Sequence, residues 1–167
     1  MTGAVLTGYA ALFDVVDGGG DMIRPGAFAR VLRNQAHRSL PMLWQHDPSR
    51  PIGRWTAVCE DHLGLRVTGH LTPGVQRSEE AARLIASGAL SGLSIGFKAV
   101  RAQTGKAARR VLTEIDLWEV SLVTFPQIPG ARVQLVAPPE ATTQKSAQVP
   151  VARLTGRLGT YRSRRSL

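Results

Sequence analysis

A serine between two glycines is the first feature of this sequence that could carry out chemistry. Residues 92–96 read Gly-Leu-Ser-Ile-Gly and place Ser94 at the centre. Flanking glycines leave a serine hydroxyl uncrowded and allow a sharp backbone turn, as in the G-x-S-x-G pattern of many hydrolases. In α/β-hydrolases an acid and then a histidine follow this serine, but all four histidines of this chain precede Ser94. The chain order therefore excludes the α/β-hydrolase fold, and the pattern alone also fits a small residue in a strand turn.

His46 is the candidate base for such a serine. It lies in the segment Leu-Trp-Gln-His-Asp-Pro at residues 43–48, where an apolar strand is expected to end before Pro48. A strand end holds a side chain rigidly and leaves it accessible. Imidazole accepts and returns a proton near neutral pH, which suits it to general-base work on a hydroxyl. A surface histidine in an Asp-Pro turn fits the same residues.

Glu119 is the candidate acid. Strand alternation over residues 114–124 places it on one face with four other side chains, Ile115, Leu117, Ser121 and Val123. Burial of an unpaired carboxylate is costly, so a histidine N–H or an arginine is expected to meet it. The alternative is an edge strand with a solvated Glu119 face and a core face made of Trp118, Val120 and Leu122.

Short strands and two helices would have to position these residues. Alternating hydrophobicity predicts strands over residues 5–13, 40–45, 93–100 and 111–125, and a hairpin over residues 55–72 that turns at 61–64. Helical spacing predicts helices over residues 27–35 and 77–87, the second with Ser78 as its N-cap and Gly88 as its stop. The glycine-rich segment 17–21 and the basic segment 101–110 are predicted loops.

The last part of the chain has a different composition. Beyond Val136 it is rich in Pro, Ala, Thr, Gln, Ser and Arg, with too few large apolar side chains to order itself. Six of the 21 Lys and Arg residues, but none of the 12 acidic residues, lie in residues 141–167. We predict one folded domain over residues 1–137 and a disordered basic tail over residues 138–167, which can bind an acidic surface or remain solvated.

Composition also weighs against several classes of protein. The longest apolar runs are far shorter than the roughly 20 residues that cross a bilayer, so no membrane partner is expected. The N-terminus does not read as a signal peptide, so we expect the chain to stay in the cytoplasm where it is made. The pI of about 11.2 raises the alternative of a nucleic-acid-binding module. The few aromatic residues are spread through apparent core segments, however, so specific nucleic-acid binding is not expected.

A metallohydrolase built on His46, His62 and His70 is a further alternative. The spacings of these histidines match none of the zinc patterns, and the latter two fall in the predicted hairpin. We therefore expect no metal and no cofactor.

Five blocks of the sequence, in this order, resemble the prohead or capsid-maturation serine proteases of tailed phages, a family related in fold to the herpesvirus assemblins. The blocks are Gly-Tyr-Ala-Ala-Leu-Phe at 8–13, Ile-Arg-Pro-Gly-Ala-Phe at 23–28, Leu-Trp-Gln-His-Asp at 43–47 followed by Pro-Ile-Gly at 51–53, Leu-Ser-Ile-Gly-Phe at 93–97, and Trp-Glu-Val-Ser-Leu-Val-Thr-Phe-Pro at 118–126. The resemblance implies a triad of His46, Ser94 and Glu119, with the nearby Ser91 as a less favoured nucleophile. Arg132 and backbone N–H groups after Phe125 are candidate oxyanion donors.

The same resemblance implies a fold and a function. The fold would be α+β, a small mixed, mainly antiparallel, herpesvirus-assemblin-like β-barrel wrapped by helices. The function would be that of a serine endopeptidase enclosed in the prohead in the cytoplasm of the bacterial host. It would cleave scaffold or the scaffold-like arm of the major capsid protein, and itself, and a homodimer is compatible with it. The alternative is a catalytically inactive relative that acts as a capsid assembly or scaffolding factor, against which an intact triad argues.

Overall fold

The computed structural model describes residues 3–34 and 40–136 of the 167-residue chain. Eight strands and two helices form over these ranges. In chain order they are β1 Val5–Leu12, β2 Asp21–Ile23, α1 Ala29–Arg33, β3 Pro41–Trp44, β4 Asp47–Glu60, β5 Gly64–Leu71, α2 Gln76–Ala86, β6 Gly92–Gln103, β7 Arg110–Val123 and β8 Val133–Val136. The expected α+β class, dominated by strands, is confirmed.

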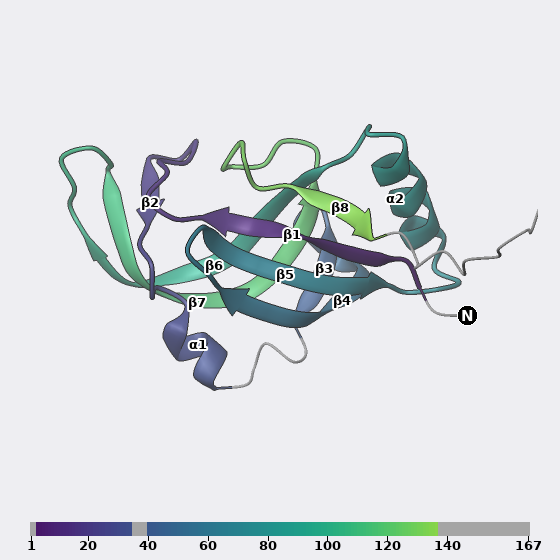
Figure 1. Ribbon diagram of the computed structural model, residues 1–167, viewed down its shortest axis with the longest axis horizontal. Helices are drawn as coiled ribbons and strands as arrows, with labels where there is room; N and C mark the ends of the chain where they lie inside the picture. The colour runs from purple at the N-terminus through teal and green to yellow at the C-terminus, as the bar shows by residue number, and fades with distance from the viewer. Residues whose placement is uncertain (1–2, 35–39, 137–167) are drawn as a thin grey trace, which may run out of the picture.

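The strands form one mixed, mainly antiparallel sheet in the order β2-β7-β3-β4-β5-β1-β8, with β6 on β7 (Figure 1). β7 pairs in parallel with β2 and β3, and the other ladders are antiparallel. The long β6–β7 hairpin extends at one end of the molecule beside β2, and α2 lies at the other end beside β8. β7 is therefore the strand on which three others meet.

The expectation of a closed barrel wrapped by helices is wrong. The segment before β8 meets β6 through one isolated bridge, between Gly92 and Arg132. The next residue, Val133, already pairs with Gly8 of β1, so the contact with β6 does not continue as a ladder. The two helices, only five and 11 residues long, lie at different ends of the sheet and do not enclose it (Figure 1).

The hydrophobic core lies against one side of β7. Trp55 of β4 is fully buried, and its indole Nε1–H donates to the carbonyl oxygen of Val120 at 2.9 Å. Burying the large ring stabilises the core, and the hydrogen bond satisfies its one polar group. This contact fixes the backbone of β7 beside Glu119.

Side-chain contacts hold both hairpins near their turns. Between β4 and β5, the Asp61 carboxylate accepts hydrogen bonds from the backbone N–H of Leu63 at 2.8 Å and from Tyr9 Oη at 2.5 Å. The hairpin predicted to turn at residues 61–64 is thus confirmed. Directly after the turn of the β6–β7 hairpin, Arg110 forms a bidentate ion pair with the buried Asp21 of β2, with its Nε at 2.8 Å from Oδ1.

Both predicted helices are present with small changes. α1 is shorter than the predicted range 27–35, whose last residue lies outside the described part of the chain. α2 agrees closely with the predicted range 77–87. Ser78 is not its N-cap, because Val75 occupies that position and the Ser78 hydroxyl donates to the carbonyl of Ile52 at 2.6 Å.

The predicted tail, residues 138–167, lies outside the described residues. Within the described ranges, neither helix has the length and apolar character needed to span a membrane.

Candidate active site

His46 lies at the tip of a tight two-residue turn. Gln45 and His46 join β3 to β4 with φ angles of 54° and 61°, which are unusual for residues other than glycine. The turn is held against β7 by three hydrogen bonds: Gln45 N to Leu122 O at 2.9 Å, Gln45 Nε2 to Thr124 Oγ1 at 2.9 Å, and His46 N to Ser121 Oγ at 3.1 Å. Backbone strain persists where neighbours over-determine it, and it concentrates at functional sites.

The apolar strand ends before Pro48, as predicted, because β3 stops at Trp44, but a second strand follows the turn at once. β4 begins at Asp47, which pairs with Trp44, and runs on through Pro48. His46 is therefore fixed from both sides by strands rather than followed by a loop.

The His46 side chain meets Glu119. Its Nδ1 lies 2.6 Å from Glu119 Oε1, and Ser121 Oγ donates to the other carboxylate oxygen, Oε2, at 2.6 Å. Because an ionised carboxylate only accepts hydrogen bonds, Nδ1 is the donor. Glu119 is 8% exposed and Ser121 is 0% exposed, whereas the imidazole remains 42% exposed. The carboxylate thus fixes one ring nitrogen and leaves Nε2 available for proton exchange.

Glu119 reaches this position because β7 contains a β-bulge. Gly96 pairs with Glu119 but the next residue, Phe97, pairs with Leu117, so Trp118 is the extra residue. The bulge breaks the alternation, so Leu117 faces the core while Glu119 and Ser121 face the other side.

Neither sequence-based description of the Glu119 face is fully right. Glu119 does not continue the row of Ile115 and Leu117, and it is not solvated. Of the proposed opposite face, Val120 and Leu122 are core residues, but Trp118 is 57% exposed. The expectation that the carboxylate meets a histidine is confirmed.

Ser94 lies on β6 directly opposite Ser121 of β7. Residues opposite each other in an antiparallel pair project from the same face, so Ser94 shares the face that carries Glu119. It is 5% exposed. Ser91 lies just before β6, where its carbonyl accepts a hydrogen bond from Val133 N at 2.9 Å.

The two glycines of the serine pattern serve close packing rather than a sharp turn. A Cβ on Gly92 would lie 2.4 Å from the Val123 carbonyl oxygen, and a Cβ on Gly96 would lie 2.3 Å from Glu119 Oε1. Gly96 therefore makes room for the carboxylate to fold across β6 and reach His46.

An open apolar groove of ≈ 610 Å³ begins at His46 and Glu119. Its other lining residues are Pro41, Leu43, Pro48, Pro51, Gly96, Phe97 and Trp118. Ser94 lines a separate small cavity of ≈ 30 Å³, and Phe97 contributes to both. The structure thus joins His46 to Glu119 and places Ser94 on the neighbouring strand.

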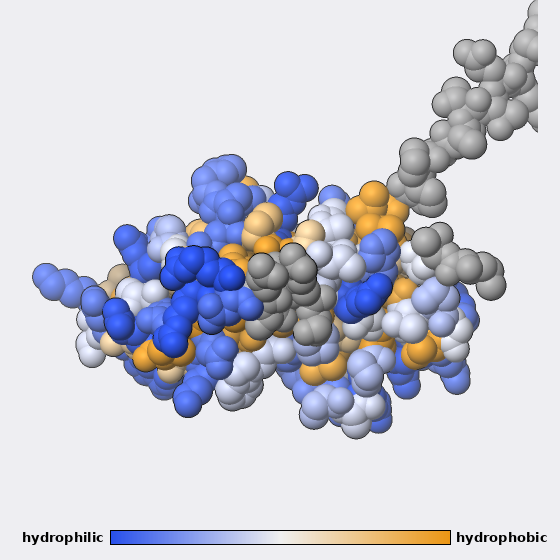
Figure 2. All heavy atoms as spheres, turned by 90° about the horizontal axis from the view of Figure 1, so that it is seen from below, coloured by the Kyte–Doolittle hydropathy of each residue, from blue (hydrophilic) through white to orange (hydrophobic). Residues whose placement is uncertain are grey.

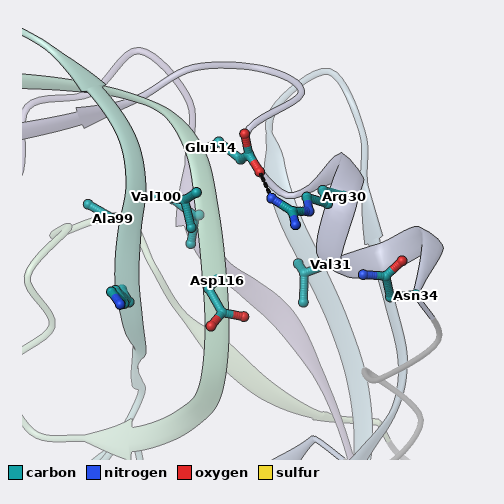
Figure 3. Close-up of a pocket in the computed structure, with 9 residues that line it drawn as sticks. Arg30, Val31, Asn34, Ala99, Val100, Glu114 and Asp116 are labelled. Atoms are coloured by element: carbon teal, nitrogen blue, oxygen red, sulfur yellow. Dashed lines mark hydrogen bonds and ion pairs between the residues drawn. The ribbon is translucent and has the colours of Figure 1, made fainter.

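A second hollow, of ≈ 480 Å³, lies between α1 and the β6–β7 hairpin (Figure 3). Arg30 Nη1 donates to Glu114 Oε1 at 2.7 Å, and Arg101 lies 3.8 Å from the same carboxylate. The Arg30 hydrogen bond holds the pKa of Glu114 below its ordinary value. No serine or histidine is among the described residues that line this hollow, so it does not contain the serine–histidine pair of a serine protease.

The remaining sequence candidates are Arg132, His62 and His70. Arg132 lines a groove with Tyr9 and Arg66. His62 lies in the β4–β5 turn and His70 in β5. Within residues 3–34 and 40–136, no three His, Cys, Asp or Glu residues form a group that could hold a metal ion.

Three solved structures share this fold. KSHV protease has a TM-score of 0.57 at 17% identity, over 81% of this chain and 66% of the other. The bacteriophage T4 capsid assembly protease, gp21, has a TM-score of 0.57 at 12% identity, over 72% of this chain and 83% of that protein. Varicella-zoster virus protease has a TM-score of 0.52 at 18% identity, over 84% of this chain and 67% of that protein. The similarity to these herpesvirus proteases confirms that the fold is herpesvirus-assemblin-like, although its sheet is not closed into a barrel.

Sequence comparison gives closer relatives. The chain is 34% identical to the prohead protease of Enterobacteria phage HK97 over 128 residues, 73% of this chain and 55% of that protein. It is 34% identical to a capsid polyprotein of Pseudomonas phage PAJU2 over 127 residues, 70% of this chain and 19% of that protein. The chain thus spans about half the length of the first relative and a fifth of the second. Residues 1–146 match the family described as caudovirus prohead serine protease, and the chain belongs to that family.

Proposed function

We propose that this chain is a serine endopeptidase of phage capsid maturation, with Ser94 as nucleophile, His46 as base and Glu119 as the acid that orients the base. The observation that carries the proposal is the 2.6 Å contact between His46 Nδ1 and Glu119 Oε1, on the face of the sheet that Ser94 shares. Family membership gives the reaction class, and the geometry supports the roles.

The reaction would be acyl transfer from a peptide to water. His46 Nε2 takes the proton from Ser94 Oγ as the oxygen attacks the peptide carbonyl carbon, and it returns that proton to the leaving amine as the C–N bond breaks. A water molecule then hydrolyses the acyl-enzyme by the same proton route. Glu119 keeps the Nδ1–H tautomer in place and balances the imidazolium charge. Arg132 is a candidate oxyanion donor, because its pairing with Gly92 turns its side chain to the face of Ser94.

The substrates would be capsid proteins. The relatives are a prohead protease and a capsid polyprotein by name, and one structural neighbour is a capsid assembly protease. We propose that the chain acts inside the prohead, in the cytoplasm of the bacterial host, on scaffold or the scaffold-like arm of the major capsid protein, and on itself. The apolar groove beside His46 would receive part of the extended substrate.

The test is co-expression of the chain with the capsid protein of the same phage, followed by mass measurement of both products. The wild-type chain should yield shortened products, and Ser94→Ala should yield none while it still folds. The matched control, Ser91→Ala, should cleave normally. Cleavage by Ser94→Ala together with loss in Ser91→Ala would overturn the choice of nucleophile. Particle assembly without any cleavage by the wild type would favour the inactive assembly factor.

A further inference from the structure

We propose that Ser121 is a positioning residue that sets the geometry and tautomer of His46 through Glu119, an inference that rests on the proposed function. Ser121 is fully buried, and its hydroxyl makes two contacts within the site. It accepts from the backbone N–H of His46 at 3.1 Å and donates to Glu119 Oε2 at 2.6 Å. One side chain thus contacts both the backbone of the base and the carboxylate of the acid.

The chemistry of these partners fixes the direction of each hydrogen bond. A backbone N–H can only donate and an ionised carboxylate can only accept, so the single Ser121 proton must point at Glu119. Glu119 Oε2 is then occupied, which leaves Oε1 to receive Nδ1–H of His46. Ser121 therefore orients the carboxylate that orients the imidazole.

The same hydroxyl also anchors a strained backbone. His46 has a φ of 61°, in the left-handed region, and its N–H needs an acceptor on β7 to keep the turn in place. Without that acceptor the turn can relax and the ring can shift. A displacement of about 1 Å in a reacting group can reduce a rate by about 100-fold.

Ser78 is a matched control for Ser121. It is also buried, at 1% exposure, and its hydroxyl also makes a 2.6 Å hydrogen bond, to the carbonyl of Ile52, with no hydrogen bond to His46 or Glu119. Ser78→Ala and Ser121→Ala therefore each delete a buried hydroxyl from a similar environment, but only Ser121 contacts the site.

The first experiment measures kcat and KM on a peptide that spans a mapped cleavage site. Ser121→Ala should lower kcat by about 10- to 100-fold with KM changed by less than about twofold. Both variants should lower the Tm by a few degrees, because each loses a buried hydrogen bond. Only Ser78→Ala should keep kcat within about twofold of the wild-type value. Ser121→Thr, which retains a hydroxyl, should recover most of the lost rate. A folded Ser121→Ala variant with normal kcat, or a Thr variant as slow as the Ala variant, would overturn the proposal.

A double-mutant cycle tests whether Ser121 acts through Glu119. If it does, the kcat of the double variant Ser121→Ala/Glu119→Gln should be less than about threefold below the kcat of Glu119→Gln alone. Multiplicative losses would show an independent role and contradict the proposal. If Ser121→Ala does not fold, Ser121→Cys supplies the test, because a thiol is a weak donor of nearly the same shape; normal kcat for this variant would also contradict it.

A spectroscopic measurement separates this inference from the proposed function. The ¹⁵N chemical shifts of His46, assigned by comparison with His46→Gln, should show the Nδ1–H tautomer in the Ser94→Ala chain and a mixture after Ser121→Ala is added. This readout needs no turnover. An unchanged tautomer would refute the role of Ser121, whereas normal cleavage by Ser94→Ala would refute only the proposed nucleophile.

Discussion

At the residue scale, the Glu119 carboxylate has hydrogen-bond partners on both oxygens and almost no contact with solvent. Glu119→Gln keeps the size of the side chain but presents an amide that can stabilise the wrong imidazole tautomer and cannot balance an imidazolium charge. We expect kcat to fall by at least about 100-fold while the chain remains folded. Cleavage rate and Tm measure the two effects.

Glu114→Gln is the control for this variant, since it makes the same change on the same strand in the ion pair with Arg30. Its cleavage rate should be normal. An unchanged rate for Glu119→Gln would reduce the proposed triad to a dyad.

Gly96 provides an independent test of the same contact. The methyl group of Gly96→Ala would lie 2.3 Å from Glu119 Oε1, so the flexible carboxylate must move away from His46. We expect a folded protein whose kcat is reduced about as much as by Glu119→Gln. Gly105→Ala is the control, because its methyl group meets the tip of Val111 at 2.7 Å in the turn between β6 and β7. Equal rates for both alanine variants would show that Gly96 does not protect the contact.

A histidine or an arginine beside Glu119 could be predicted because burial of a charge is costly and demands a partner, and the family resemblance pointed to His46. The participation of Ser121 could not, since a serine in an apolar strand carries no such cost and resembles a small core residue. Its one available signal is its position two residues after Glu119, which puts both side chains on one face of a strand.

At the scale of elements, the strands around the site follow the predicted pattern except where β7 bulges. A bulge at Trp118 has no sequence signature, and counting by two across it assigns the wrong face to Glu119. The turn at Gln45 and His46 could not be predicted either, because two-residue hairpin turns with positive φ normally use Asn and Gly. β2 and β8 have three and four residues, too few to show a period.

The ion pair of Asp21 with Arg110 joins β2 to β7 and predicts a pH-dependent stability. Hydrogen bonds from Arg110 hold the pKa of Asp21 below its ordinary value of 3.8. A lowered carboxyl pKa stabilises the folded state above the unfolded pKa, and this stability is lost as pH falls through the folded pKa. Arg110→Gln should therefore lower the unfolding free energy by about 1–2 kcal/mol near pH 7. The difference from wild type should shrink below about pH 4.

Denaturant unfolding at pH 7, 5 and 3 would measure this difference. Arg101→Gln is the matched control on the same hairpin, because the Arg101 side chain is 74% exposed and lies 3.8 Å from Glu114. Its effect should stay below about 0.5 kcal/mol at every pH. A pH-independent loss in Arg110→Gln would mean that Asp21 is not the titrating partner.

At the scale of the whole molecule, polar and apolar surface are distributed unevenly. Strongly hydrophilic residues gather toward the end that carries α1, β2 and the β6–β7 hairpin, and hydrophobic residues form small separate groups on the face in view (Figure 2). The ion pairs of Arg30 and Arg110 lie at that end. The apolar groove at His46 lies instead where β3, β4 and the bulge of β7 meet. Charge therefore stabilises the hairpin end, while the candidate site presents an apolar surface.

Removal of residues 138–167 tests the division of the chain into a catalytic domain and a basic tail. The last buried residue of the hydrophobic core is Val133, and six Lys and Arg residues without any acidic residue lie in residues 141–167. We expect the truncated chain to keep a cooperative melt and its rate on a short peptide, because neither depends on those charges. Its incorporation into particles should fall, because a basic segment binds acidic surfaces through counterion release.

A full-length chain with those six residues changed to glutamine separates charge from length. If charge drives docking, this variant should be incorporated as poorly as the truncated chain, and incorporation of the wild type should decrease as salt is raised during assembly. Normal incorporation of the glutamine chain would assign docking to the tail's sequence or length rather than to its charge. Loss of folding in the truncated chain would instead show that residues after 137 belong to the domain, because a solvated tail contributes no buried surface to lose.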